Sequence, residues 1–189
     1  MSELGESVFN AFTFLNDFLK DVSKLVTIVE EKLKNKRLMA LGDAATFWDH
    51  SRAYYAPTQW MPQYIVRHYS AKLSLESKRR WKAPWVAFFT VYLAPDQTKE
   101  PVAVWGVATQ NEIKNFWNIL KNFGLYQKNP EYLNKVPTLQ WETTMDLPES
   151  LSSFKYMSIN LLELNNAQKV DEIVIKPLLL EINELRRTS

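Results

Sequence analysis

The side chains best suited to chemistry in this sequence are its two histidines, His50 and His68. His50 follows Asp49, and histidine is the usual general base near neutral pH when an acidic group orients it. The two histidines are eighteen positions apart, a spacing that matches no helical zinc motif. Acid–base chemistry, metal ligation and a purely structural role therefore stay open as alternatives.

A cluster of cations surrounds a tryptophan at Ser77–Lys82, which reads Ser-Lys-Arg-Arg-Trp-Lys. Arg79 and Arg80 are suited to binding phosphate while the ring of Trp81 stacks on a base. The same charges suit a solvated surface, or a contact with acidic helices of the same chain. Both interpretations stay open.

These residues belong to a segment of unusual charge. Residues 32–82 hold eleven Lys and Arg against three Asp and Glu, a local charge of +8 in a chain whose total is +2. The segment also holds eight aromatic residues, and cations interleaved with rings are typical of nucleotide and nucleic-acid sites. The alternative for these aromatic residues is a structural role, in which they form a lid over the core of a sheet. We predict an anion-binding site here, with the following ligand-binding residues: Trp48, His50, Arg52, Tyr55, Trp60, Arg67, His68, Arg79, Arg80 and Trp81.

Composition narrows the classes of function. The chain has no cysteine, which excludes disulfides, thiol catalysis and cysteine-ligated metals. It contains no glycine-rich phosphate loop and no nucleophilic-serine motif. We therefore predict no catalytic residue, no cofactor and no metal, and an enzyme would have to use His50 or His68. The acidic N-terminus and the lack of a long apolar run favour a soluble cytoplasmic protein without a membrane partner.

The elements that would position this site form a single α+β domain over residues 1–189. Residues 6–36 are predicted to form one helix, because apolar residues recur at steps of three and four. These are Val8, Phe12, Leu15, Leu19, Val22, Val26, Val29 and Leu33. Further apolar residues widen this band beyond one face. The band is either buried within the domain or in contact with a partner chain, for example in a homodimer.

The rest of the chain is predicted as a basic aromatic segment, a sheet and a closing helix. Residues 38–82 are expected to be irregular or to form short helices, with 38–48 and 63–75 as candidates, because Pro57 and Pro62 interrupt longer elements. Residues 84–164 are expected to form a four-stranded, largely antiparallel sheet of two hairpins with one inserted helix. The predicted elements are strands at 84–93, 102–109, 138–145 and 154–164, a helix at 112–123, and a closing helix at 166–187 that Pro177 either kinks or splits in two.

Two classes of function follow from these patterns. The first is a non-enzymatic ligand-binding or sensor domain whose anionic ligand, a nucleotide or a nucleic acid, is held by the basic aromatic segment. The alternative is a protein-interaction module, such as an adaptor, chaperone or regulatory subunit, that works through its terminal helices. In that case a homodimer would form through the N-terminal helix.

Overall fold

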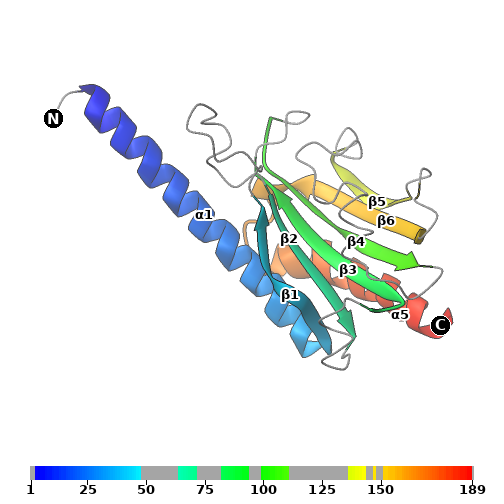
Figure 1. The fold of residues 1–189 in the computed structure, drawn as a ribbon. Coiled ribbons are helices and arrows are strands. Elements are labelled where there is room, and N and C mark those ends of the chain that lie inside the picture. Colours follow the sequence, from blue (N-terminus) through cyan, green and yellow to red (C-terminus); the bar gives the residue numbers. More distant parts are fainter. Residues whose placement is uncertain are drawn as a thin grey trace.

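The computed structural model of the protein describes residues 3–47, 64–71, 82–93, 99–110, 136–143, 147 and 151–188. Within these ranges it has a long N-terminal helix, six strands and a segmented closing helix (Figure 1). The helical elements are α1 (Glu3–Asn35), η3 (Leu161–Glu163), α4 (Ala167–Lys169), η4 (Val170–Ile175) and α5 (Lys176–Thr188). The strands are β1 (Leu38–Phe47), β2 (Tyr64–Ala71), β3 (Trp85–Tyr92), β4 (Val102–Gln110), β5 (Thr138–Thr143) and β6 (Leu151–Asn160).

The strands form one sheet in the order β1-β2-β3-β4-β6-β5. Every neighbouring pair is antiparallel. β1 to β4 follow one another as a meander, whereas β5 lies at the far edge beside β6. The predicted α+β class with terminal helices is confirmed, but the sheet has six strands rather than the four we predicted.

The two additional strands lie in the segment where the prediction was wrong. We expected residues 38–82 to be irregular or to form short helices at 38–48 and 63–75. Instead β1 occupies Leu38–Phe47 and β2 occupies Tyr64–Ala71. Side chains on both faces of β2 are buried, so this strand lacks the alternation of apolar and polar residues by which a half-buried strand is recognised.

The other predicted strands are present with shifted ends. The strands expected at 84–93 and 102–109 are β3 and β4, which pair along their whole length. The strand expected at 138–145 is β5, and the one expected at 154–164 is β6, which starts earlier and gives way to η3. The helix predicted at 112–123 lies outside the described residues.

Apolar side chains are buried on both faces of the sheet, in two separate cores. The first core joins one face of the sheet to the helices, and it includes Val29, Leu33, Trp105, Ile159, Val174 and Leu178. The second core lies on the opposite face and includes Val66, Phe88, Tyr92, Val104 and Phe154. Gly106 pairs with Phe88 and with Tyr156 on the adjacent strands. A Cβ at Gly106 would come within 2.7 Å of the Phe88 ring, so this position requires glycine.

The closing helix is irregular just before its proline. Asn166 caps its start, because its side chain accepts a hydrogen bond from the backbone N–H of Lys169. η4 is a π-helical stretch that continues directly into α5, and Pro177 is the second residue of α5. Because proline has no N–H, it cannot donate the backbone bond that this position of a continuous helix would otherwise make. The irregularity expected at Pro177 therefore takes the form of a π-helical segment ahead of it.

Candidate functional site

Only two of the ten predicted ligand-binding residues lie within the described parts of the chain. Arg67 and His68 are neighbours on β2. The other eight lie outside the described residues, namely Trp48, His50, Arg52, Tyr55, Trp60, Arg79, Arg80 and Trp81. Because adjacent residues of a strand face opposite sides of the sheet, the structure does not bring Arg67 and His68 together.

Arg67 faces α1 and pairs with a carboxylate of that helix. Its Nη2 and Nε atoms lie 2.5 and 3.1 Å from Oε2 of Glu30. Arg67 is only 8% exposed, so this charge-assisted contact compensates for the burial of the guanidinium. A second ion pair joins the same helix to η4, with Nζ of Lys32 3.0 Å from Oδ1 of Asp171. For these two cations the structure shows contact with acidic groups of the same chain.

His68 faces the second core, opposite Leu41 and Phe88. Its side chain is buried. Burial, and to a smaller extent the charge of Arg67, lowers the pKa of His68 to about 3. The imidazole is therefore neutral at pH 7, and it is both a weak base and shielded from solvent. Within the described ranges, no three His, Asp or Glu side chains converge as a group that could hold a metal ion.

The most unusual surface of the described structure is the first half of α1. We call residues 3–21 the projecting half and residues 22–35 the anchored half. Figure 1 shows the projecting half extending away from the strands and from the closing helix. Five of its large apolar residues are exposed to solvent: Leu4 by 75%, Val8 by 48%, Phe9 by 65%, Phe12 by 69% and Phe14 by 74%.

One continuous apolar stripe runs along both halves of α1. Successive members are alternately four and three residues apart, which is the 3.5-residue repeat of a coiled-coil seam. The stripe consists of Val8, Phe12, Leu15, Leu19, Val22, Val26, Val29 and Leu33. From Val22 onward it contacts the first core, where Val22, Val29 and Leu33 are buried. Before Val22 the cover decreases toward the N-terminus: Leu19 is half-buried against the first core and Leu15 is half-buried, whereas Val8 and Phe12 are exposed.

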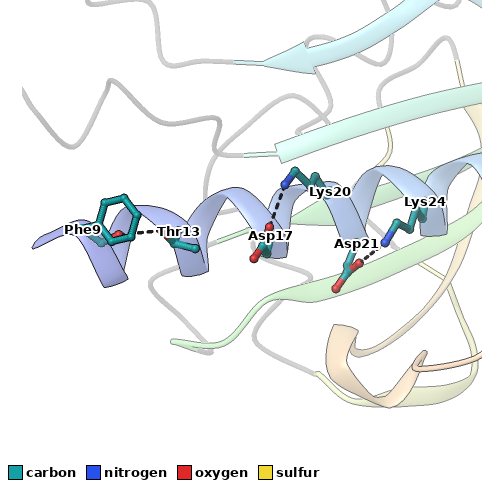
Figure 2. A network of polar contacts seen from close by, with 6 residues as sticks. All are labelled: Phe9, Thr13, Asp17, Lys20, Asp21 and Lys24. Carbon is teal, nitrogen blue, oxygen red and sulfur yellow. Dashed lines mark hydrogen bonds and ion pairs between the residues drawn. The ribbon is translucent and has the colours of Figure 1, made fainter. Parts of the chain in front are cut away.

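The polar side of the projecting half is satisfied within the helix itself. Figure 2 shows Lys20 bonded to Asp17 at 2.9 Å and, across the boundary between the two halves, Lys24 bonded to Asp21 at 2.8 Å. The hydroxyl of Thr13 donates to the carbonyl of Phe9 at 3.0 Å in the same way (Figure 2). Because these groups bond along the helix, the polar side is suited to water, and the apolar side is the part that lacks cover.

The sequence predicted an apolar band that is too wide for one face, but not which part of it is exposed. One signal of the exposed part was available in the sequence: residues 7–16 contain no charged side chain.

None of the described helices is long and apolar enough to cross a membrane. In comparisons with known proteins, no family model, curated protein or solved structure matches the chain.

Proposed function

We propose that the protein is an interaction module that binds another protein chain through the projecting half of α1. The supporting observation is the exposure of Leu4, Val8 and Phe12 along one side of a helix whose continuation is buried, with Phe9 at the edge of that side. Scattered apolar residues on a surface need no explanation, but a contiguous apolar patch marks a site of interaction.

The size of the patch supports this proposal. Phe9 and Phe12 are 65% and 69% exposed, and with roughly 200 Å² for each aromatic side chain they leave about 270 Å² of ring surface in water on this side of the helix. A helix that lacks packing along such a length is also only marginally stable in water. A partner that covers the stripe would therefore stabilise the helix and remove apolar surface from water.

Photo-cross-linking in the cell tests this proposal. A photoreactive phenylalanine derivative replaces Phe12 in one variant and Asn10 in the other. Both positions are exposed, but they lie on nearly opposite sides of the helix because successive residues are about 100° apart. We expect protein adducts from position 12 and few from position 10. Equal labelling, or no protein adduct from position 12, would contradict the proposed function.

A second candidate function is the binding of an anionic ligand, such as a nucleotide or a nucleic acid. It is supported by the charge of +8 over residues 32–82, although Arg67 and Lys32 pair with carboxylates of the chain itself. Replacing Arg79, Arg80 and Trp81 together by alanine should abolish binding of a fluorescent nucleotide or oligonucleotide without unfolding the protein. Unchanged binding would remove this candidate.

A further inference from the structure

Two buried hydroxyl groups lie on the face of the sheet that carries the second core. They are Oγ1 of Thr90 on β3 and Oγ of Ser158 on β6, and both residues are 0% exposed. Neither hydroxyl makes a hydrogen bond within the described structure. Burial of an unpaired hydroxyl is unfavourable, because its bonds to water are lost and nothing replaces them. Two such groups on one face therefore indicate a partner that the sheet does not supply.

The two hydroxyls belong to one row of side chains that crosses the sheet. Thr90 pairs with Val104 on β4, and Val104 pairs with Ser158 on β6. Val66 on β2 pairs with Thr90 and continues the row. Paired residues point to the same face and neighbouring strands are about 4.8 Å apart, so roughly 10 Å separates Thr90 from Ser158. One water molecule cannot span this distance, whereas one elongated molecule can contact both hydroxyls.

This row consists of short side chains, and aromatic rings occupy the rows beside it. Gly106, which has no side chain, lies between Phe88 and Tyr156 in one neighbouring row. In the other row Tyr64 and Tyr92 are paired, with 6.0 Å between their ring centroids. Successive rows are two residues, or about 6.6 Å, apart along the strands. Short side chains between aromatic rows suit a flat and mostly apolar molecule, and ligand sites commonly have such a lining with few polar groups.

The side chains next to the row are uncharged at neutral pH. Burial lowers the pKa of His68, which pairs with Phe88, to about 3, so the imidazole is neutral. Burial also raises the pKa of Tyr156, so its phenol keeps its proton. The carboxylate of Glu142 lies further out, on the edge strand β5 beyond Tyr156. A charged ligand over the row would lose its hydration without gaining a counter-ion, so these side chains favour an uncharged one.

We propose that this face of the sheet binds an uncharged, flat and mostly apolar small molecule with a hydrogen-bonding group at each end. One end bonds to the hydroxyl of Thr90 and the other to the hydroxyl of Ser158, and the body of the molecule lies over Val104. A hydroxyl both donates and accepts, so carbonyl, hydroxyl and amide end groups all fit. The site lies on the face opposite the helices, and it does not involve the projecting half of α1.

Two serines of the same face separate this site from ordinary packing. The hydroxyl of Ser70, which is 1% exposed, donates to the carbonyl oxygen of Trp85 at 3.1 Å. In ligand-free protein refolded from urea, Ser70→Ala should lower the urea midpoint of unfolding, because a buried bond is lost. Ser158→Ala and Thr90→Val should leave the midpoint unchanged or raise it. If Ser158→Ala lowered it as much as Ser70→Ala, its hydroxyl would have a partner within the protein, and the proposal would be overturned.

Equilibrium dialysis with radiolabelled estradiol tests binding directly, because this probe is uncharged and flat and carries a hydroxyl at each end. We expect saturable binding of one molecule per chain. The double variant Thr90→Val, Ser158→Ala should weaken the affinity about tenfold or more, as the loss of one or two hydrogen bonds does. Absence of saturable binding, or the same affinity in the double variant, would contradict the proposed site.

Two controls assign the binding to this face. The sulfate ester of estradiol has the same skeleton with a charge, and it should bind about tenfold more weakly or less. Phe12→Asp changes the projecting half alone and should leave the affinity for estradiol unaltered. Loss of binding in Phe12→Asp would place the probe on α1, and equal binding of the sulfate ester would show that the site does not select an uncharged molecule. Either result would overturn the proposal.

Discussion

The two halves of α1 share one sequence pattern but have different surroundings. The anchored half places Val22, Leu25, Val29 and Leu33 in the first core. In the projecting half, Val8 and Phe12 of the same stripe face solvent, whereas Leu15 and Leu19 are half-buried. The helical repeat is the same on both sides of Val22, so the difference arises only from what lies opposite. A periodic stripe specifies a face that needs a partner, and the tertiary fold decides whether that partner lies within the chain.

The charged residues of the two halves differ in the same way. In the anchored half, Glu30 reaches Arg67 on β2 and Lys32 reaches Asp171 on η4. In the projecting half, ion pairs form along the helix, as between Lys20 and Asp17. Contacts between elements fix the anchored half to the sheet, whereas exposed pairs within one helix stabilise it only slightly.

The largest expected effect comes from placing the same carboxylate in each half. Val29→Asp buries a charge in the first core, where Val29 is 0% exposed, and should lower the free energy of unfolding by about 4 kcal/mol. Val8→Asp places the charge in water and should change the stability of the monomer by less than about 0.5 kcal/mol. Urea denaturation of the purified protein measures both.

The two valines are a matched pair, because they belong to the same stripe of the same helix. An equal loss of stability in both variants would show that the projecting half is packed within the monomer. The comparison between the halves would then fail, and the interaction module would lose its supporting observation.

A smaller effect is expected from the ion pair that fixes the anchored half. Glu30→Ala leaves the guanidinium of Arg67 buried without its carboxylate, and breaking one side of a buried pair is destabilising. Because Glu30 is 38% exposed, water replaces part of the lost contact, and we expect about 2 kcal/mol rather than the full penalty of a buried pair. Thermal and urea denaturation measure the loss.

Glu31→Ala is the matched control, since Glu31 is the next residue of α1 and is exposed. It should change stability by less than about 0.5 kcal/mol. If Glu30→Ala were equally mild, Arg67 would be satisfied without its contact to α1, and the ion pair would not explain why this half is held to the sheet.

The sequence allowed α1, the closing helix and the later strands to be predicted for clear physical reasons. The spacing of three and four in α1 has no other regular explanation, and the strands β3 and β4 are rich in β-branched and aromatic residues. β2 was missed because Arg67 and His68 interrupt its apolar run. Each polar side chain is accommodated on a different face, one by Glu30 and the other within the second core.

The candidate site was less predictable than the fold. Sequence reasoning drew attention to residues 32–82, where charge and rings are concentrated, and recognised contact with acidic helices as an alternative. It did not identify Glu30 as the partner of Arg67, because that pair joins residues 37 positions apart. Nor did it separate the exposed part of α1 from the buried part, because exposure depends on where the sheet ends rather than on the stripe itself.

The smallest expected effect is a difference in pH dependence between the sheet, which contains His68, and the projecting half of α1. His68 has a pKa of about 3 in the folded protein and an ordinary value near 6.5 when unfolded. As pH falls below the ordinary value, the unfolded state takes up a proton that the folded state does not, so the folded state loses stability. Between pH 7 and pH 5.5 this contribution is about 1.3 kcal/mol. A His68→Gln variant should lose less stability over this interval than the wild-type protein by that amount.

Acid should not act on the projecting half in the same way, because its exposed stripe contains no ionisable side chain. The yield of protein adducts from the photoreactive residue at position 12 should therefore stay within about twofold between pH 7 and pH 5.5, while the unfolding free energy of the protein falls. Parallel loss of adducts and of stability would mean that the contact with the partner involves the sheet. It would also mean that the projecting half does not associate independently of the body to which α1 is anchored.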